Sequence, residues 1–578
     1  MRLGLAWAAV LGVVSGIAAM ARPISVAEIN YNPLDGSDYE FIELINPGTT
    51  PFVLTGCQFT AGIDYVFGAL TLPAGGRVVV ARDLGKFASR YPGVTALGPY
   101  KKKLSDTGDT VVFKSAVGAE LFRVKYDSSG AWPSRANGLG SSLEVLDPNG
   151  DLNDPLNWRS SAEYQGSPGR AGIGGVRTVV INEVLPHTDP PFEDAIEFKN
   201  LTDQPINIGG GYLSNSRAAP LKYRLPRTLI VPAHGYAVVY ERSFNSASQG
   251  AEAFTFNSAH GDEAVLLAAD AAGNPTLWLD AVSFDASANG VSFGRYPDGT
   301  GPLITLARQT FGTDLTAAFP PEFLSEFILG KGASNAGPLV GPVVFNRIQY
   351  QPLAGQEEFL ELKNITGLTV PLYDPAYPTN AWRLGDGVGF TFPTGHQLGA
   401  GETAWVVRTN PAAFRLKYGI SEEVQIFGPF TNALSNAGER LELFRPDATQ
   451  GPQHPDFGFV PYILVDQVDY KPTAPWPEAA AGTGAYLERV NPAGYGNDPA
   501  NWRAATTTQA PVLLQAERLA NGRLRLTVIG ARLAPLRLES SPALGAPVWA
   551  LVATLTAGSG NWVQEVLLTD AAAFYRVR

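Results

Sequence analysis

Short stretches in which apolar and polar residues alternate recur along the chain, and each follows a turn rich in glycine or proline. The clearest are residues 76–81, 236–240 and 403–408. Alternation with a period of two places every second side chain against a core, so these stretches predict half-buried β-strands. Residues 84–91 and 411–418 instead space their apolar residues three or four apart, which predicts a short helix after the first and third strands.

A longer pattern repeats three times. Residues 24–46, 180–200 and 344–364 each hold an apolar strand, a polar gap and a second apolar strand that ends in asparagine. The three asparagines, Asn46, Asn200 and Asn364, are 154 and 164 residues apart. That spacing is a whole domain rather than a solenoid repeat, so the pattern predicts an array of three related β domains.

Two further landmarks recur at matching places. A glycine beside an acidic residue precedes a strand at Gly108, Gly261 and Gly438, and we expect a positive φ at each because only glycine adopts it cheaply. The neighbouring acids, Asp109, Asp262 and Glu439, are expected to support the turn or the strand start. Trp158 and Trp502 close the first and third units and are expected to plug the ends of the cores, rather than to form exposed stacking platforms for sugars.

These landmarks give the predicted domain limits. They are 22–174, 177–338 and 340–508, followed by a different module over 511–578. In that module Leu524, Leu526 and Val528 alternate with polar residues, which predicts four or five short strands in a sandwich-like arrangement.

Composition supports an ordered all-β chain. Of 578 residues, 62 are glycine and 45 are proline, 10% are aromatic and only 17% are charged. The net charge is −11, which disfavours a nucleic-acid partner. The basic run Lys101 to Lys103 is expected to be a solvated loop.

The N-terminus reads as an export signal. Arg2 precedes an apolar stretch, and Ala19 and Ala21 frame the small-x-small pattern that signal peptidase cuts, so residues 1–21 are expected to be removed. A membrane anchor is the alternative, but the stretch is short, and no later stretch is long and apolar enough to span a bilayer. The predicted location is therefore secreted or cell-surface. The single Cys57 excludes an internal disulfide and is expected to be a buried packing residue.

Sequence motifs give little support for catalysis. The chain has no HExxH, GxSxG or P-loop motif, and a metal site assembled from its five distant histidines stays unsupported. Glu43, Glu197 and Glu361 recur within apolar strands; they could be ligands or acid–base groups, but we expect outward-facing structural positions. Glu28 and Glu183 also correspond, yet Arg347 replaces them in the third copy, which argues against an essential catalytic acid.

A loop near the end of the first unit spaces oxygen-bearing side chains two apart, like the start of a calcium loop: Asp147, Asn149, Asp151, Asn153 and Asp154. Leu152 stands where the EF-hand glycine belongs and Trp158 where the bidentate glutamate belongs, so an Asx-rich turn is expected, and calcium stays the alternative. Asn200 and Asn364 also begin formal glycosylation sequons, but their shared place at a strand end indicates a turn instead.

Taken together, the landmarks resemble the lamin tail domain, an immunoglobulin-like β-sandwich, over residues 22–508. The resemblance rests on the opening pair of strands, the Leu-Pro-Ala-Gly-Gly turn at 72–76, the Ser-Asp-Thr-Gly-Asp turn at 105–109 and the closing Asn-Asp-Pro-Leu-Asn-Trp at 153–158. It implies tandem immunoglobulin-like sandwiches of the kind that often accompany secreted bacterial enzymes. The C-terminal module resembles the end modules of large secreted bacterial proteins.

The resulting hypothesis is a secreted or cell-surface binding, adhesion or scaffold protein without catalysis, cofactor or catalytic residues of its own. Its partner would be an extracellular protein or polysaccharide. One alternative is a carbohydrate-binding protein that uses Trp382, Trp405 and Trp476 as exposed aromatics. The other is an extracellular hydrolase with its site in the divergent stretch 309–336.

Overall fold

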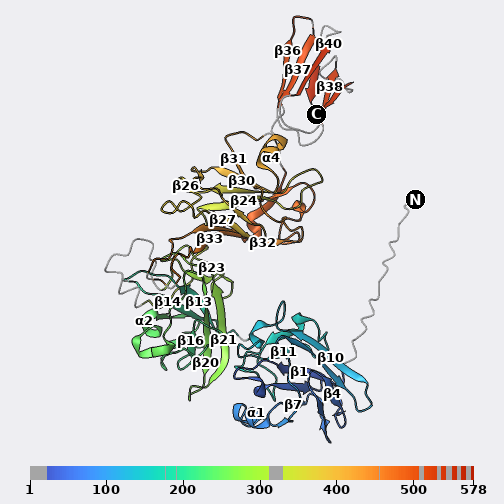
Figure 1. Ribbon diagram of the computed structural model, residues 1–578, viewed down its shortest axis with the longest axis vertical. Helices are drawn as coiled ribbons and strands as arrows, with labels where there is room; N and C mark the ends of the chain where they lie inside the picture. Colours follow the sequence, from blue (N-terminus) through green and yellow to red (C-terminus); the bar gives the residue numbers. More distant parts are fainter. Residues whose placement is uncertain are drawn as a thin grey trace, which may run out of the picture.

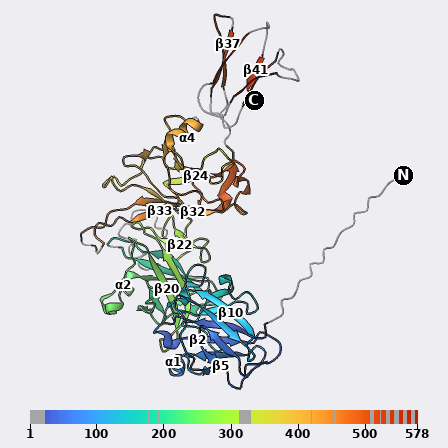
Figure 2. The ribbon, with the colours of Figure 1, turned by 45° about the vertical axis from the view of Figure 1, so that its right-hand side comes forward.

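A computed structural model describes residues 22–175, 177–190, 192–311, 330–418, 420–452, 454 and 456–506, and the strands of the C-terminal module between 513 and 577. The predicted export signal, 1–21, and most of the divergent stretch 309–336 lie outside the described residues. The second and third sandwiches and the C-terminal module follow one another along the longest axis, while the first sandwich packs against the second (Figures 1 and 2).

The first sandwich pairs a six-stranded sheet, β12-β11-β1-β2-β7-β8, with a four-stranded sheet, β10-β9-β4-β5, and adds a ribbon, β3-β6. Its elements are β1 Ser25–Asn30, β2 Phe41–Ile45, β3 Phe52–Val53, β4 Gln58–Ala61, β5 Tyr65–Val66, β6 Thr71–Leu72, β7 Arg77–Ala81, α1 Leu84–Arg90, β8 Ala96–Leu97, β9 Gly108–Lys114, β10 Glu120–Asp127, β11 Leu143–Val145 and β12 Trp158–Ser160.

The second sandwich has a five-stranded sheet, β19-β14-β13-β22-β23, a four-stranded sheet, β17-β16-β20-β21, and a ribbon, β15-β18. Its elements are β13 Val179–Leu185, β14 Ala195–Asn200, β15 Ile206–Asn207, β16 Tyr212–Ser214, β17 Tyr223–Arg224, β18 Ile230–Val231, β19 Tyr236–Tyr240, α2 Glu241–Phe244, β20 Asp262–Ala269, β21 Pro275–Phe284, β22 Phe293–Arg295 and β23 Leu303–Thr305.

The third sandwich repeats this plan with sheets β31-β30-β25-β24-β34-β35 and β28-β27-β32-β33 and a ribbon, β26-β29. Its elements are β24 Val343–Gln349, β25 Phe359–Asn364, β26 Val370–Pro371, β27 Arg383–Asp386, β28 Phe390–Thr391, β29 Gln397–Leu398, β30 Thr403–Val407, α4 Pro411–Tyr418, β31 Gln425–Phe427, β32 Glu439–Pro446, β33 Tyr462–Tyr470, β34 Tyr486–Arg489 and β35 Trp502–Ala505. The strands and both helices predicted from periodicity are thus confirmed, as is the all-β fold.

The C-terminal module has two three-stranded sheets, β36-β37-β40 and β39-β38-β41. Its strands are β36 Leu513–Arg518, β37 Arg523–Ile529, β38 Leu536–Ser541, β39 Ala550–Leu555, β40 Trp562–Leu567 and β41 Phe574–Val577. The sequence predicted four or five strands, whereas the described residues of the module form six. Apolar and polar residues alternate less regularly in β36 and β40, so the signals of these two strands in the sequence are weaker.

Each sandwich encloses its own core, and each large sheet carries a second apolar cluster on its outer face. In the first sandwich Phe41 and Val79 project outward and are covered by Phe87 of α1; in the third, Phe414 of α4 covers Phe359. Burying each of these phenylalanine rings contributes roughly 2–3 kcal/mol. The large sheets are therefore covered on both faces, which is why β1 and β13 are buried at every position.

The repeated asparagines anchor the turn after the second strand. The Asn46 Nδ2 group donates to the carbonyls of Thr50 and Leu72, and its Oδ1 accepts from the Gly48 amide. Asn200 and Asn364 make the same set of contacts and are likewise fully buried. The turn interpretation of the two sequons is confirmed, since a buried, fully bonded amide offers no surface for a glycan.

The predicted positive φ angles are also confirmed, at 117° for Gly108, 80° for Gly261 and 95° for Gly438. A Cβ at Gly438 would lie 2.6 Å from the Tyr470 carbonyl oxygen, so the close strand approach also requires glycine. Glu439 supports this turn as expected, because its Oε1 accepts from the Ser435 amide. Trp158 and Trp502 are 4% exposed and lie in the cores of the first and third sandwiches, as expected of end plugs.

The first and second sandwiches are joined by backbone pairing. The Tyr164 amide donates to the Thr276 carbonyl, and the Trp278 amide donates to the Ala162 carbonyl, so the chain after β12 forms a short antiparallel bridge with β21. Trp278 is 5% exposed, and its Nε1–H donates to the Gly140 carbonyl at 2.9 Å. This junction therefore combines main-chain hydrogen bonds with one buried aromatic anchor.

We expect Trp278→Ala to loosen this junction, because it removes the buried ring and its hydrogen bond while leaving the rest of β21 in place. Small-angle scattering of residues 22–578 should show a larger radius of gyration, and proteolysis within 165–178 should speed up. Thr276→Ala is the matched control, since that residue contributes only its backbone. An unchanged scattering profile for Trp278→Ala would show that the ring does not hold the junction.

Candidate functional site

The recurring acids are positioned by a bulge in the first strand of every sandwich. The register shifts between Val26 and Glu28 in β1, and at the corresponding places in β13 and β24. Because of the shift, Glu28 stands opposite Glu43, Glu183 opposite Glu197, and Arg347 opposite Glu361. These side chains lie on the face of the large sheet that is turned away from the core.

The prediction that these acids face away from the core is confirmed, and the structure adds that their side chains are buried. Glu43 and Glu197 are fully buried and Glu361 is 3% exposed. The first sandwich adds Glu144 of β11, which stands opposite Glu28 in the register. In the first and second sandwiches, the chain that follows the closing strands folds back over these carboxyl groups and covers them; over residues 163–174 and 330–336 we call it the return segment.

In the first sandwich the return segment is held by the carboxyl groups. The Gly169 amide donates to Glu43 Oε1 at 2.6 Å, and the Ser167 amide donates to Glu28 Oε1 at 2.8 Å. Arg77 pairs with the other oxygen of Glu43 at 2.5 Å. Glu144 accepts from the Ser167 hydroxyl and pairs with Arg159.

The second sandwich uses the same plan with other partners. Glu183 accepts from the Ser292 hydroxyl at 2.5 Å and from the amide and hydroxyl of Thr310. Glu197 accepts from the Asn182 side chain at 2.7 Å and from the Ala333 amide at 2.9 Å. Here too a carboxylate on the second strand captures an amide of the returning chain.

In the described residues of the third sandwich, an arginine takes the role that the return segment has in the other two. Arg347 lies 3.2 Å from Glu361 and 2.9 Å from Glu488, while Asn346 donates to Glu361. Arg503 pairs with Glu488 from the other side. The guanidinium thus satisfies the carboxylates that backbone amides satisfy elsewhere, which explains how the third copy tolerates an arginine at this position.

Burial shifts the titration of these acids. It raises the pKa of Glu28 to about 8, with the Glu43 charge adding to the rise, and it raises the pKa of Glu183 to about 7. Burial also raises the pKa of Glu43 and of Glu361, although the paired arginines oppose it. In each case the shifted carboxyl is bonded to neighbouring parts of its own sandwich.

The loop considered for calcium uses its oxygens to build turns. Asp147, Asp151 and Asp154 accept from the backbone amides two residues ahead, at 2.9 Å each. The Asn149 and Asn153 side-chain oxygens accept from the amides of Arg22 and Lys125. These contacts are those of an Asx-rich turn, in agreement with the expectation.

Two of the five histidines lie near the same carboxylate, although they are far apart in the sequence. His260 of the second sandwich lies 3.0 Å from Asp456 of the third and stacks on Phe459 with ring centres 3.9 Å apart, while His454 lies 3.9 Å from the same carboxylate. Within the described residues, no group of three or more His, Cys, Asp or Glu is placed to hold a metal ion. This cluster therefore serves as a contact between the second and third sandwiches.

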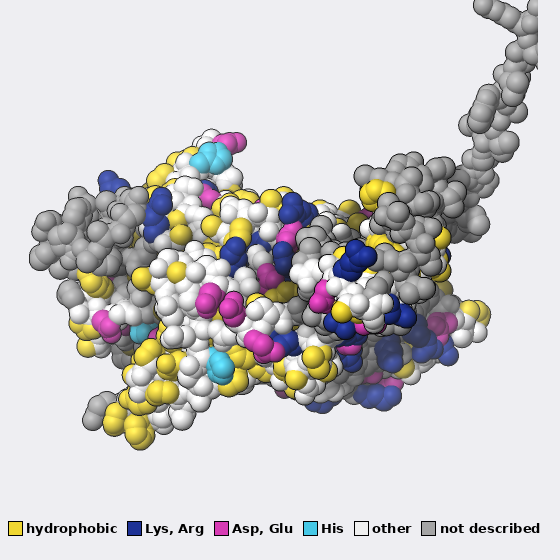
Figure 3. Space-filling view, turned by 90° about the horizontal axis from the view of Figure 1, so that it is seen from above, with side chains coloured by type: hydrophobic (Ala, Val, Ile, Leu, Met, Phe, Trp, Pro, Cys, Tyr) yellow, Lys and Arg dark blue, Asp and Glu magenta, His cyan; other side chains and the backbone are white. Residues whose placement is uncertain are grey.

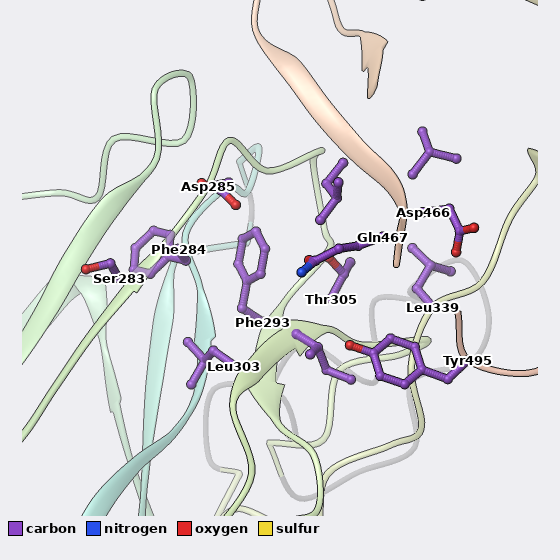
Figure 4. A pocket seen from close by; sticks show the side chains of 13 residues that line it. Ser283, Phe284, Asp285, Phe293, Leu303, Thr305, Leu339, Asp466, Gln467 and Tyr495 are labelled. Atoms are coloured by element: carbon purple, nitrogen blue, oxygen red, sulfur yellow. The ribbon is translucent and has the colours of Figure 1, made fainter. Parts of the chain in front are cut away.

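A cavity of about 100 Å³ lies at the same joint (Figure 4). Phe284 and Phe293 line it from the second sandwich, and Gln467 and Tyr495 line it from the third. Figure 4 shows the Gln467 amide directed toward Thr305 across the joint. Because sites for small molecules typically enclose about 300–1,000 Å³, we interpret this cavity as a packing gap between sandwiches.

The aromatics named for sugar binding are not exposed platforms. Trp382 and Trp476 are 4% and 5% exposed and belong to the third core, and Trp405 is half-buried against Phe359 and Phe414. Cys57 is 2% exposed and packs in the first core, as expected. The face drawn in Figure 3 intersperses hydrophobic side chains with charged ones rather than gathering them in one patch.

The feature that sequence reasoning missed is a groove of about 390 Å³ in the third sandwich. Tyr373 and Tyr377 line it on one side, and Arg445, Pro446 and Asp447 line it on the other. Its only signal in the sequence was the extra length of two connections in the third copy.

Comparison with known proteins agrees with this architecture. A model of the Lamin Tail Domain family matches residues 18–128 and 175–284. These two segments are lamin-tail-like. The matches end close to the ends of β10 and β21, so the closing strands and return segments lie beyond them.

No curated protein matches the chain. Among solved structures it is similar to the exo-chitosanase CsxA of Amycolatopsis orientalis, with 11% identity and a TM-score of 0.12. The likeness covers 46% of this chain and 26% of the chitosanase, and at that TM-score it carries no argument. In the described residues, no helix is long and apolar enough to cross a membrane.

We expect Glu28→Gln to make the first lamin-tail-like sandwich more stable at alkaline pH. The folded-state pKa of Glu28 is about 8, above its ordinary value of 4.5. Its stabilising contribution is therefore fully present below pH 4.5 and is lost as the pH rises through 8, an effect on the order of 4 kcal/mol. Calorimetry from pH 5 to 9 should show this loss in the wild type and a smaller one in the variant.

The control for this comparison is Glu120→Gln, which alters an exposed acid of the same sandwich. It should leave the pH dependence of the first sandwich unchanged. Parallel pH profiles of wild type and Glu28→Gln would contradict a buried carboxyl that is protonated in the folded state.

Proposed function

We propose that this chain is an exported, multi-domain binding or scaffold protein of the cell surface or the secreted fraction, without catalysis of its own. The observation that carries this proposal is the use of the recurring acids. Within the part of the chain that the structure describes, the residues that best fit an acid–base or ligand role by type, recurrence and burial are Glu28, Glu43, Glu183, Glu197 and Glu361. All five are bonded to return segments, neighbouring strands or arginines that hold the sandwiches together.

We also propose that the third sandwich is a further lamin-tail-like domain. It has the same bulge in its first strand, the same Asn364 contacts and the same left-handed glycine, Gly438. Its Trp476 and Trp502 rings lie 6.2 Å apart, close to the 5.9 Å between Trp132 and Trp158 of the first. On this view the domains cover 22–174, 177–338 and 340–508, with the C-terminal module over 511–578.

The array suits binding over an extended surface. The second and third sandwiches and the terminal module follow one another along the longest axis, with the first sandwich beside the second, and the first junction is held by backbone pairing (Figure 1). The net charge of −11 favours a protein or a neutral polysaccharide as the extracellular partner over an anionic polymer. The alternative of a hydrolase site in 309–336 rests on a stretch that lies largely outside the described residues.

Export is tested by fractionating cells that produce the full chain and sequencing the N-terminus of the recovered protein. We expect the protein outside the cytoplasm, beginning at Arg22, because Ala19 and Ala21 supply the small residues that the peptidase requires. Replacing both with arginine should leave an unprocessed, retained precursor. Cytoplasmic protein that still carries Met1 would overturn the proposed location and, with it, an extracellular partner.

A further inference from the structure

The third sandwich differs from the other two in the length of two connections. Eleven residues separate β26 from β27, whereas four separate β3 from β4 and four separate β15 from β16. Fifteen residues separate β32 from β33, whereas five separate β9 from β10 and five separate β20 from β21. We call these longer connections the first insertion, residues 372–382, and the second insertion, residues 447–461.

The two insertions meet and build the groove described above. The Asn380 side chain of the first donates to the Thr449 hydroxyl of the second at 3.3 Å. Tyr373 and Tyr377 come from the first insertion, Asp447 comes from the second, and Arg445 comes from the strand that leads into it. The groove volume of about 390 Å³ falls within the range typical of ligand sites.

The first insertion is held in one shape by its own backbone. The Asp374 amide donates to the Asn380 carbonyl at 2.8 Å, and the Asn380 amide donates to the Tyr377 carbonyl at 2.8 Å. The Asp374 side chain accepts from the Ala376 amide at 2.8 Å. Pro375 and Pro378 further limit the unfolded freedom of the loop. Tyr377 is thus presented on a braced loop, although its side chain is 54% exposed.

We propose that this groove binds a neutral saccharide. This inference rests on the proposed extracellular binding function and adds the class of ligand to it. An exposed tyrosine ring offers a flat apolar surface for the apolar face of a sugar ring. Asp447 and Arg445, whose charged groups lie 3.7 Å apart, offer an acceptor and donors that ring hydroxyls can bridge. With Asp374 also lining the groove, acids outnumber the arginine, so an anionic polymer is disfavoured.

A proline-rich peptide is the competing occupant of an aromatic-lined groove. Such a peptide needs neighbouring exposed rings to receive successive prolines. Here Trp382 is 4% exposed, and Tyr377 is the lining ring that projects most into solvent. The single projecting ring beside an acid–arginine pair fits a sugar better than a polyproline helix.

The experiment measures binding of residues 22–578 to immobilised laminarin, xylan and mannan as neutral probes, with alginate and a proline-rich decapeptide for comparison. We expect one or more neutral polysaccharides to bind. We expect Tyr377→Ala to weaken that binding about tenfold or more, because the stacking surface is lost. Asp447→Asn should weaken it as well, since it removes the charge while keeping the shape.

Phe457→Ala is the matched control, because Phe457 is an aromatic of the second insertion that is 67% exposed and does not line the groove. It should bind the polysaccharide as the wild type does. Circular dichroism of all variants checks that the fold is kept. Equal loss in Phe457→Ala and Tyr377→Ala would overturn the groove as the site.

Failure of this inference and failure of the proposed function give different results. Neutral polysaccharide binding that survives Tyr377→Ala and Asp447→Asn would overturn the groove but keep a binding protein. Capture of the decapeptide or of alginate alone would overturn a neutral saccharide as the ligand. A precursor retained in the cytoplasm would overturn the extracellular function, whatever the groove binds in vitro.

Discussion

The fold depends on a bulge in the first strand of each sandwich. One extra residue in β1, β13 and β24 turns the next side chain to the outer face of the large sheet, opposite an acid of the second strand. A carboxylate in that position is buried and must be satisfied, and it is satisfied by amides of a return segment or by an arginine. The bulge thus determines where the chain goes after the closing strand and which face of the sheet is covered.

The three copies solve the same burial problem with different chemistry. In the second and third cores, Arg295 pairs with Asp280 and Arg489 pairs with Asp466, each at 2.7 Å. By register, the first core has Val145 and Phe122 at these places. A buried ion pair and an apolar pair of similar size can contribute comparably to stability, so each is tolerated while the backbone stays the same. Sequence divergence inside the cores therefore does not signal divergence of fold.

The sequence predicted the fold well because its signals are local. Alternation located β7, β19 and β30, and glycine beside an acid located three left-handed turns. The burial of Glu43 could not be predicted in this way, because it depends on Gly169, 126 residues later, folding over it. The same holds for His260 and Asp456, which meet only through the second insertion. Trp382 and Trp476 were candidates for exposed sugar-binding platforms because residue type alone does not distinguish a buried tryptophan from an exposed one.

The large sheets with their return segments are distinct from the connections that vary in length. This distinction has a consequence for how such arrays can change. The connections between β3 and β4 and between β9 and β10 lie in the first sandwich where the two insertions lie in the third, and the matching connections of the second sandwich are equally short. Residues added at these positions would touch neither the buried carboxylates nor the return segment. The first two sandwiches therefore offer ready grafting positions, where a new recognition loop could be installed one copy at a time.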